Sequence, residues 1–491
     1  MKLGELLAVL GDKVVSFGGD LSTELCGATP DSRQVKPGML FCAMKGARLD
    51  GHQFIDSALE KGAKAVLLVD AHDLPQGTPW LQVRDPYPVF GLVAEAFAGR
   101  SADKLDVLAV TGTNGKTTTA YLLRALWRGA GRRTGMIGTV EYDVLAKEGV
   151  SLEADRTTPT PFELQALLSR LVENGGEAVA MELSSHALEQ RRAANMKCSA
   201  AVFTNLTQDH LDYHLTMENY YQAKKLLFTD FLKVGAPAVM NCDDSYGARL
   251  AAELNGVCNV KGYSFKDAGR EYAFKVLELS SQRTVLEMRC GGEVFTLETP
   301  LIGMYNAYNV AGAAVCAHAC GIRDFSAAIA GCKGAPGRLE RVPVPGNRFS
   351  VFVDYAHTDD ALKNVLGTLR ELKSSQGRLV VVFGCGGDRD RKKRPLMAKA
   401  AASLADYVYV TSDNPRTERP EDIIAEVLTG IPQDASYTAI CDRAEAIKEA
   451  IASAGDGDII LIAGKGHEDY QEVNGVKHPF DDRLVAAACL E

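Results

Sequence analysis

The sequence predicts an α/β protein with mainly parallel sheets, and three observations lead to this class. Apolar runs rich in β-branched residues alternate with stretches of helical periodicity in the last part of the chain, which is typical of βαβ units. A glycine-rich turn joins an apolar run to a helical pattern at 105–131. The length of 491 residues exceeds what one core can hold, so the chain should divide into about two to four domains.

The last part of the chain shows the clearest alternation. Its strand-like runs are FSVFVDY (349–355), RLVVVFG (378–384), DYVYVTS (406–412), SYTAIC (436–441) and DIILIAG (458–464). Helical spacing follows in DALKNVLGTLRELK and RAEAIKEAIASAG. Such an order predicts a buried parallel sheet that binds ligands at the carboxyl ends of its strands. The functional loops should therefore be GCGGDRD, DNPR and GKGHED, each of which directly follows a strand.

The rest of the chain contains further strand patterns. The middle part begins with LDVLAV, a glycine turn and the helical KTTTAYLLRALWRGAG, and continues with the strands EAVAMEL and AAVFTNL. Residues 272–301 alternate in the manner of antiparallel strands. In the first part, MLFCAMKG, KAVLLVD and WLQVRD read as strands around one helix. Proline and glycine gather in RDPYPVFG (84–91) and KGAPGRLERVPVPG (333–346), which we expect to be hinges between domains.

Composition narrows the class of partner. The net charge of -9 and the pI near 5.6 disfavour a general nucleic-acid binder, because such binding depends on excess Lys and Arg. The N-terminal MKLGELLAVLGDKVV is interrupted by charges and reads as neither a signal peptide nor a membrane span. Twelve scattered cysteines without a CxxC pair indicate reduced thiols. We therefore expect a cytoplasmic protein with small-molecule partners, no nucleic acid and no membrane.

The stretch TGTNGKTTT, Thr111 to Thr119, indicates a nucleotide site. A strand that enters a glycine turn and leaves as a helix points backbone N–H groups and the helix dipole at an anion. Lys116 would reach the outer phosphates and Thr117 would bind Mg²⁺. The loop is short, because Gly112 comes two residues later than the usual leading glycine. The alternative is a glycine turn that only caps a helix.

Two segments further on carry the side chains that a divalent cation needs. MELSSH places Glu182 at the end of a strand, and TNLTQDHLDYH places His210 and its neighbours in the same way. Zinc and a serine nucleophile are alternatives, but the HExxH and GxSxG patterns are absent from these segments. Mg²⁺ shared by Glu182, Thr117 and ATP oxygens fits the hard oxygen ligands better. Polar caps on strand ends are the remaining reading.

The pair Cys316 and Cys320 flanks His318 in VCAHAC. This spacing invites a metal site, yet no further ligands accompany it in the segment. The surrounding alanines predict a helix, so we expect both cysteines to be small buried residues.

The motifs TGTNGKTTT, MELSSH, TNLTQDHLDYH, YNAYN and DYAHT, in this order, resemble the Mur ligase family of ATP-dependent amide ligases. DSRQVKPGMLFCAMKG and LDGHQFI are similar to the UDP-binding domain of that family, so the resemblance covers nearly the whole chain. It implies a UDP-binding N-terminal α/β domain, a central P-loop ATPase-like domain with a mainly parallel sheet and a Rossmann-like C-terminal domain that binds an amino acid. With the hinges, these domains are expected at 1–86, 87–337 and 338–491.

The resemblance implies a set of catalytic and ATP-binding residues. Lys116, Glu182, His210 and Lys224 would be catalytic, with Lys224 matching a lysine that the family carbamylates. Mg²⁺ would be the cofactor, held by Thr117, Glu182, His210 and the carbamate of Lys224. ATP, the co-substrate, would contact Gly112, Thr113, Asn114, Gly115, Lys116, Thr117, Thr118, Asn306, Asn309, Arg338 and Asp354.

The resemblance also implies where the acceptor binds. UDP-N-acetylmuramoyl-L-alanyl-D-glutamate would contact Ser32, Thr157, Thr158, Ser184, Gln190 and Arg192. Two positions depart from the family pattern. Arg156 stands where asparagine is common, which puts one substrate contact in doubt, and Asp359 stands where proline is usual, at an expected helix start.

GGDRDRKKRPLM, DNPR and GKGHE are similar to the members of the family that add meso-diaminopimelate. An arginine can pair with the far carboxylate of diaminopimelate, which lysine lacks. The expected contacts are Arg389, Asp413, Asn414, Pro415, Arg416, Gly464 and Glu468. The expected function is ATP-dependent addition of meso-diaminopimelate to the D-glutamate unit, by a monomer. The alternatives are a lysine-adding or folate-extending ligase of the family and, in another class, a nucleotide-gated regulatory or transporter ATPase.

Overall fold

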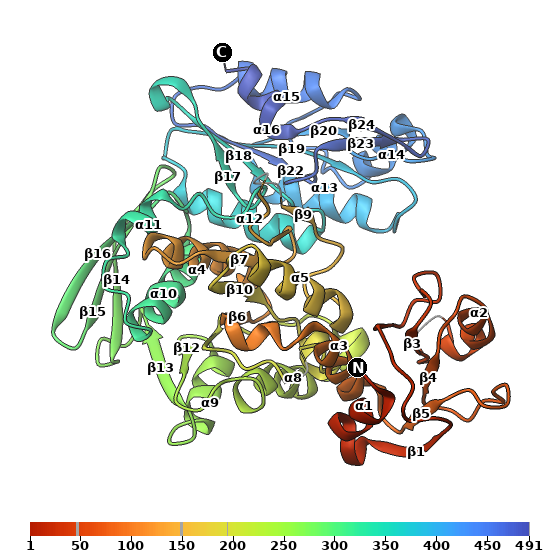
Figure 1. Cartoon of the computed structure of the whole chain (residues 1–491). Helices are drawn as coiled ribbons and strands as arrows, with labels where there is room; N and C mark the ends of the chain where they lie inside the picture. Colours follow the sequence, from red (N-terminus) through yellow and green to blue (C-terminus); the bar gives the residue numbers. More distant parts are fainter. Residues whose placement is uncertain (46–48, 148–150, 194, 491) are drawn as a thin grey trace. The chain divides into compact units, whose positions relative to one another are not determined.

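The computed structural model describes residues 1–45, 49–147, 151–193 and 195–490. The chain divides into two compact units, one of Met1–Tyr263 with Gly312–Arg323 and the other of Ser264–Ala311 with Asp324–Glu491. Helix α10 (Met304–Ala319) runs through both units (Figure 1). The α/β class with mostly parallel sheets is confirmed. The three predicted domain ranges stay a prediction.

The first part of unit 1 is a five-stranded sheet with the order β1-β5-β4-β3-β2, in which only the β1–β5 pair is antiparallel (Figure 1). The three predicted strands form the centre of this sheet, with Gly46 of the first run outside the described residues. The sequence did not reveal the two edge strands or the first helix. The elements are α1 (Leu3–Leu10), β1 (Val14–Gly18), β2 (Gly27–Thr29), β3 (Met39–Cys42), α2 (Ile55–Glu60), β4 (Ala65–Leu68), β5 (Trp80–Val83) and α3 (Pro86–Ala98).

The stretch 84–91, predicted as a hinge, contains the start of helix α3, and a hinge between domains there stays a prediction. Asp85 caps the helix by accepting a hydrogen bond from the N–H of Tyr87, and Pro86 is its first residue. Proline is tolerated in the first turn, where backbone N–H groups have no partner within the helix. Phe90 is buried and packs edge-on against Phe162 of α5 with ring centroids 6.0 Å apart, so α3 belongs to the core of unit 1.

The second part of unit 1 contains the glycine-rich loop. Its strands follow the order β13-β12-β11-β6-β10-β7-β8-β9, parallel from β13 to β7 and antiparallel from there. The elements are β6 (Asp106–Thr111), α4 (Lys116–Gly129), β7 (Thr134–Ile137), β8 (Glu141–Asp143), β9 (Leu152–Glu153), α5 (Pro161–Glu173), β10 (Ala178–Glu182), α6 (Ser185–Glu189), β11 (Ala200–Phe203), α7 (Leu211–His214), α8 (Met217–Thr229), β12 (Pro237–Asn241), α9 (Ser245–Glu253) and β13 (Asn259–Ser264).

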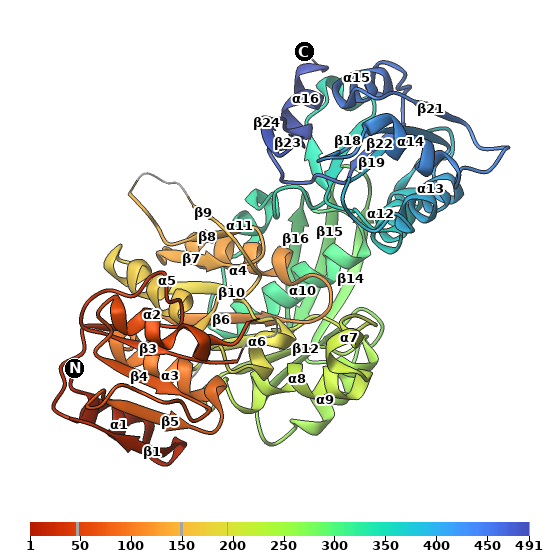
Figure 2. The same ribbon diagram turned by 90° about the vertical axis from the view of Figure 1, so that its right-hand side faces the viewer.

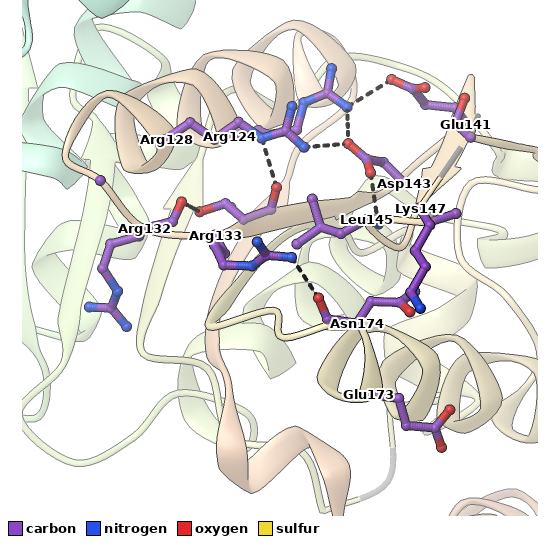
Figure 3. A pocket seen from close by; sticks show the side chains of 14 residues that line it. Arg124, Arg128, Arg132, Arg133, Glu141, Asp143, Leu145, Lys147, Glu173 and Asn174 are labelled. Carbon is purple, nitrogen blue, oxygen red and sulfur yellow. Dashed lines mark hydrogen bonds and ion pairs between the residues drawn. The ribbon is translucent and has the colours of Figure 1, made fainter. Parts of the chain in front are cut away.

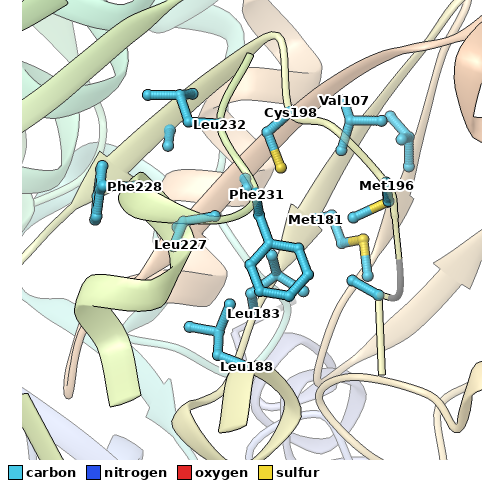
Figure 4. Close-up of a cluster of buried hydrophobic side chains, with 14 of the residues drawn as sticks. Val107, Met181, Leu183, Leu188, Met196, Cys198, Leu227, Phe228, Phe231 and Leu232 are labelled. Atoms are coloured by element: carbon cyan, nitrogen blue, oxygen red, sulfur yellow. The ribbon is translucent and has the colours of Figure 1, made fainter. Parts of the chain in front are cut away.

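The predicted strands and helix of this region are confirmed as β6, α4, β10 and β11. Strand β6 lies between β10 and β11, so its carboxyl end lies between theirs. Figure 4 shows the core packed against them, where Val107 of β6, Met181 of β10 and Phe231, which follows α8, converge. This packing fixes the strand ends from which the loop and Glu182 project.

Unit 2 begins with the antiparallel strands predicted for 272–301. They are β14 (Tyr272–Leu279), β15 (Thr284–Cys290) and β16 (Glu293–Thr299), paired in sequence order. Helix α10 and α11 (Ser326–Gly331) follow. Within α10, Cys316 is buried as expected, whereas Cys320 follows the helix end and is exposed, which corrects that part of the prediction.

The remainder of unit 2 is a six-stranded sheet with the order β17-β18-β22-β19-β20-β21, parallel except for the edge strand β17. A separate hairpin pairs β23 with β24. The elements are β17 (Glu340–Val342), β18 (Ser350–Asp354), α12 (Asp359–Leu372), β19 (Leu379–Cys385), α13 (Lys393–Leu404), β20 (Tyr407–Ser412), α14 (Pro420–Leu428), β21 (Tyr437–Ala439), α15 (Arg443–Ala452), β22 (Ile459–Ala463), β23 (Tyr470–Val473), β24 (Val476–Pro479) and α16 (Asp482–Ala488).

All five strands predicted in this part are confirmed, and helices cover both faces of the sheet. Helices α12 and α13 lie on one side and α15 and α16 on the other (Figure 2). Successive residues of the central strands alternate between the two cores, as Val381 and Val382 do. Asp359 is the first residue of α12, capped by Thr358, so it starts a helix as expected without proline. No helix of the described residues is long and apolar enough to cross a membrane.

Candidate functional site

The glycine-rich loop joins β6 to α4 at the carboxyl end of the sheet in unit 1. Gly112 and Gly115 have φ of 149° and 84°, in the region that favours glycine. A Cβ atom on Gly112 would lie 1.9 Å from Thr204 Oγ1. The N–H groups of Thr113 and Asn114 donate to the carbonyl and the side-chain oxygen of Asn205 at 2.9 and 3.0 Å. The loop is therefore fastened to the end of β11.

Lys116 folds back over this loop. Its ammonium donates to the carbonyl oxygens of Gly112 and Thr113 at 3.0 and 2.8 Å. Thr117 and Thr118 follow in the first turn of α4, where backbone N–H groups point toward an anion. The geometry is that of a phosphate loop with the lysine held at its rim.

Glu182 is fully buried at the end of β10 and contacts the loop helix. Its Oε2 accepts hydrogen bonds from the hydroxyls of Thr117 at 3.0 Å and Thr139 at 3.1 Å, and its Oε1 accepts one from the N–H of Thr139 at 2.8 Å. Burial raises the pKa of this carboxyl, while Lys116 and the hydrogen bonds oppose the rise. A buried carboxylate beside a threonine hydroxyl provides the hard oxygen donors that Mg²⁺ prefers, so these residues fit that ion.

Lys224 lies on α8 with 1% of its surface exposed. Its ammonium donates to the carbonyl of Gly112 at 2.7 Å and lies 4.6 Å from the ring centroid of Tyr220. Burial lowers the pKa of Lys224 well below its ordinary value, and the charge of Lys116 lowers it further. Although Lys224 lies on a helix, its amine is therefore buried at the loop and does not face solvent.

His210 stands at the start of α7 with a φ of 52° and an exposed side chain. Its ring lies 4.9 Å from that of His186 and 6.0 Å from that of Tyr220. Tyr220 thus has Lys224 on its ring and His210 at its edge, and its hydroxyl is 3.2 Å from Thr113 Oγ1. The structure brings His210 and Lys224 to the same tyrosine beside the loop.

Most of the residues expected to hold the dipeptide substrate form one network. Thr158 Oγ1 donates to the carbonyl of Glu182 at 2.8 Å and accepts from the N–H of Ser184 at 3.1 Å. Arg192 donates to the carbonyl of Thr158 at 2.8 Å and to Gln190 Oε1 at 2.8 and 3.0 Å.

Two further residues complete that region. Thr157 Oγ1 is 3.1 Å from Thr139 Oγ1 and so adjoins Glu182. Burial lowers the pKa of Arg192, and the charge of Arg156 lowers it further. Arg156, the departure from the family pattern, therefore adds a second positive charge to the surroundings of Arg192.

Ser32 belongs to the first part of unit 1. It follows β2 in a turn, and its carbonyl accepts a hydrogen bond from Lys61 at 2.9 Å. The adjoining Asp31 and Arg33 pair with each other at 2.8 Å. The structure does not join Ser32 to the dipeptide residues through a described contact.

The residues expected around the nucleotide base lie in unit 2. Asn306 and Asn309 are 3% and 4% exposed, and Asn309 donates to the side-chain oxygen of Asn306 at 3.2 Å. Asp354 accepts from the N–H groups of Leu339 and Ala356, and burial raises its pKa against the opposing charge of Arg338. Arg338 lies 5.2 Å from the ring centroid of Tyr355.

A cavity of about 450 Å³ lies at the carboxyl ends of β19, β20 and β22. Parallel sheets bind ligands at this edge. Six of the seven residues expected to contact the amino acid line it, and the seventh, Pro415, lies between two of them in the chain: the lining residues are Arg389, Asp413, Asn414, Arg416, Gly464 and Glu468. A Cβ atom on Gly464 would lie 2.6 Å from Asp413 Oδ2, so glycine keeps this carboxylate in place.

Arg416 has a φ of 52°, and both its backbone and its guanidinium donate hydrogen bonds to neighbouring carbonyl groups. Its N–H donates to the carbonyl of Glu472 at 3.0 Å, and its Nη1 donates to the carbonyl of Gly387 at 2.7 Å. Its Nε lies 3.2 Å from Glu472 Oε2. The guanidinium therefore enters the cavity with an internal carboxylate partner.

The sequence missed two residues at this cavity. Lys465 is fully buried, and its ammonium donates to Asn414 Oδ1 and Glu468 Oε2. Lys465 lies inside GKGHED, which was predicted to be a functional loop, and this position could have identified it. Glu472 lies on the hairpin strand β23, outside every motif, so the sequence held no signal for it.

A buried ion pair ties two of these strand ends together. Arg443 and Asp482 are both fully buried and pair through two hydrogen bonds of 2.7 Å. The remaining guanidinium N–H groups donate to the carbonyls of Ser412 and Ala463, the last residues of β20 and β22. These hydrogen bonds therefore fix the residues that precede the loops DNPR and GKGHED.

A second, open pocket of about 860 Å³ lies in unit 1 near the start of β7 and carries four arginines. Figure 3 shows Arg124 and Arg128 turned toward Asp143, and Arg133 turned toward Asn174. Arg124 donates to Glu141 and Asp143, and Arg128 donates to Asp143. Arg132 pairs with Asp106, and Arg133 donates to the carbonyls of Asn174 and Gly175. Because each of the four guanidinium groups already contacts a partner within the protein, we interpret these arginines as a structural network.

Asp50, His52 and Asp70 are the one cluster of potential metal ligands found among the described residues. His52 Nε2 accepts from the N–H groups of Val69 and Asp70 at 3.1 Å, and Nδ1 lies 2.7 Å from Asp50 Oδ1. Both ring nitrogens are thus used within the protein, and the histidine fastens β4 to the preceding loop.

Three family models match the chain in order. They are described as the Mur ligase family catalytic domain at 27–109, the Mur ligase middle domain at 110–317 and the Mur ligase glutamate ligase domain at 337–466.

Proteins of the same length are similar to this chain. Proteins named UDP-N-acetylmuramoyl-L-alanyl-D-glutamate–2,6-diaminopimelate ligase from Geobacter sulfurreducens and Geobacter metallireducens are 43% and 41% identical to it. Each covers 100% of the chain, with 99% and 98% of their own lengths matched. A solved structure with the same name is 34% identical, has a TM-score of 0.71, and covers 100% of this chain and 98% of its own.

Proposed function

Because the chain belongs to the Mur ligase family, we propose that it is an ATP-dependent amide ligase that adds meso-diaminopimelate to UDP-N-acetylmuramoyl-L-alanyl-D-glutamate. Relatives that carry this activity in their names match it from end to end. It would then be an enzyme of peptidoglycan synthesis, working as a cytoplasmic monomer on small molecules.

The observation that carries the proposal is the mixed charge of the cavity in unit 2. Arg389 and Arg416 line it together with Asp413 and Glu468. An amino acid whose far end bears a carboxylate and an ammonium needs both signs at fixed positions. Lysine has only the ammonium, so it would lack the contact between a far carboxylate and Arg416, and the cavity should therefore favour diaminopimelate over lysine.

The loop in unit 1 supports the first half-reaction. ATP would transfer its γ-phosphoryl group to the free D-glutamate carboxylate, giving ADP and an acyl phosphate. The diaminopimelate amine would then attack the acyl carbon, forming the amide and releasing phosphate. Lys116 and the loop N–H groups stabilise the negative charge of the transferring phosphoryl group. Mg²⁺, held by Thr117 and Glu182 with His210, would supply further neutralisation of the phosphate oxygens.

Lys224 would serve this site as a carbamate. The neutral amine attacks CO₂ and releases a proton, so a lysine with a lowered pKa is suited to the reaction. The product carries a negative charge in place of an ammonium that Lys116 repels, and it adds an oxygen ligand for Mg²⁺.

The dipeptide end of the acceptor would bind beside Glu182 in unit 1. Thr157, Thr158, Ser184, Gln190 and Arg192 form the network that adjoins Glu182. Arg192 with Arg156 provides the cationic pair for an acidic group of the acceptor. Ser32 would contact the uridine end.

The test measures ADP release with UDP-N-acetylmuramoyl-L-alanyl-D-glutamate, first with meso-diaminopimelate and then with L-lysine. Rapid turnover with diaminopimelate and little with lysine is expected. Turnover with lysine alone would make the chain a lysine-adding ligase. ATP turnover that ignores both amino acids and the acceptor would indicate a regulatory ATPase.

A further inference from the structure

The ammonium of Lys465 is buried behind the amino-acid cavity. The residue lies between Gly464 and Gly466, whose φ angles of 118° and 56° turn the chain sharply after β22. Its side chain is fully buried. The ammonium donates to Asn414 Oδ1 at 3.1 Å and to Glu468 Oε2 at 3.2 Å.

Lys465 fixes the orientation of the Asn414 amide. The amide oxygen accepts from the ammonium of Lys465 and from the N–H of Glu472 at 2.9 Å. The amide nitrogen donates to Glu468 Oε2 at 2.9 Å. Because the amide oxygen faces two donors, the reversed amide would place its N–H₂ against them. The side chains of Asn414 and Glu468 are therefore held as a unit.

Lys465 also sets the charge of this end of the cavity. Its ammonium contacts Glu468 and lies 3.9 Å from Asp413 Oδ1. The two carboxylates and the buried lysine leave one negative charge in surplus. A single incoming ammonium neutralises that surplus, whereas without the lysine two negative charges would remain close together.

We propose that Lys465 is a positioning residue that holds Asn414 and Glu468 ready for the far ammonium of the incoming amino acid. The proposal deepens the proposed function and rests on it. Because its side chain is fully buried, Lys465 acts through the residues that line the cavity and does not itself touch the substrate.

The experiment compares Lys465→Met with Lys465→Arg by steady-state kinetics on the full-length enzyme. Hydrogen bonds to charged groups are strong, so Lys465→Met should raise the KM for meso-diaminopimelate about tenfold or more. The KM values for ATP and for the dipeptide acceptor should stay within about twofold. Lys465→Arg keeps the charge and should recover most of the loss.

Lys477→Met is the matched control. Lys465 and Lys477 lie 5.5 and 3.8 Å from the centroid of the same Tyr470 ring, but Lys477 is on the exposed strand β24. This variant should leave the KM for diaminopimelate unchanged. If Lys465→Met does not fold, as judged by thermal unfolding, Lys465→Gln replaces it with the same expected rise.

A double-mutant cycle tests whether Lys465 acts through Asn414. In the Asn414→Ala background, Lys465→Met should add far less to the KM than it does alone. Equal effects in the two backgrounds, equal rises in all three KM values, or no rise would overturn the proposal. Turnover by the wild-type enzyme with diaminopimelate is measured first. If the wild type shows no turnover with diaminopimelate, the proposed function is refuted. If it does, and the KM of Lys465→Met for diaminopimelate is unchanged, only the inference about Lys465 is refuted.

Discussion

Arg416 and Glu472 form an ion pair at the amino-acid cavity, with Nε 3.2 Å from Oε2. The guanidinium that we expect to bind the far carboxylate of the substrate thus already has a carboxylate beside it. The bound amino acid would share or replace this partner.

Arg416→Ala should raise the KM for meso-diaminopimelate by about a hundredfold or more, because it removes a charge-assisted contact to the far carboxylate. ADP binding, measured by calorimetry, should change little. Arg419→Ala is the control, since Arg419 lies on the same loop with 77% of its side chain exposed. Equal losses of amino-acid and nucleotide binding would contradict the specificity argument.

Glu472→Gln should lower the KM for meso-diaminopimelate by a few fold. The substitution removes the negative charge that pairs with Arg416 inside the protein. A substrate carboxylate should therefore bind Arg416 with a more favourable free energy. The backbone N–H of Glu472 that holds Asn414 is retained. Steady-state kinetics check this, with Glu421→Gln, an exposed glutamate in the first turn of α14, as the control. A rise in the KM of Glu472→Gln would count against the prediction.

Lys224→Gln should abolish ligase activity and remove a carbamate signal. Enzyme incubated with ¹³C-bicarbonate should give a carbamate resonance by NMR that this variant lacks. Lys225→Gln is the matched control, because Lys225 is the next residue on α8 but pairs with Glu253 at 2.8 Å near the surface. A resonance that survives Lys224→Gln would place the modification elsewhere.

Glu418→Gln should weaken the fold near neutral pH and matter less in acid. Hydrogen bonds from Arg394 lower the pKa of Glu418 from its ordinary 4.5 to about 2. A lowered pKa in the folded state gives stability that is fully present above about pH 4.5 and is lost as the pH falls through about 2. The difference in Tm between wild type and variant, followed from neutral pH downward, should shrink in that window. A difference that stays constant would contradict this.

Arg443→Met should reduce the free energy of unfolding by about 3–5 kcal/mol, because it strands a buried Asp482 carboxylate and two carbonyl groups. Urea unfolding measures the change. The exposed pair of Arg348 and Asp456 provides the comparison, and Arg348→Met should reduce the free energy of unfolding far less. Similar costs for the two variants would mean that the buried pair adds no special stability.

The sequence predicted the strands that carry the site because their apolar runs are long and buried on both faces. The runs around Val381 and Ile460 became central strands as expected. It failed where local signals are short or ambiguous. The edge strand β2 has three residues, and the prolines at 86 and 88 concealed the start of helix α3, whose first turn accepts them.

The candidate site was predictable where its residues belong to loops that follow strands. Arg389, Arg416 and Glu468 lie in three such loops, and the sheet order brings them to one cavity. Glu472 was not predictable, because it enters through a hairpin that pairs outside the sheet. Long-range contacts of this kind depend on the fold and leave no periodic signal in the chain.

The carbonyl oxygen of Gly112 accepts hydrogen bonds from both Lys116 and Lys224. Because Lys116 and Lys224 donate to the same carbonyl, a change at either lysine affects the other. Nucleotide binding at the loop and modification of Lys224 should therefore be thermodynamically linked. Conversion of Lys224 to an anion would free this acceptor for Lys116 and remove a repulsion, and occupation of the loop by ATP would withdraw Lys116 from it. Linkage is reciprocal, so bicarbonate should tighten nucleotide binding by the same factor as nucleotide promotes carbamylation.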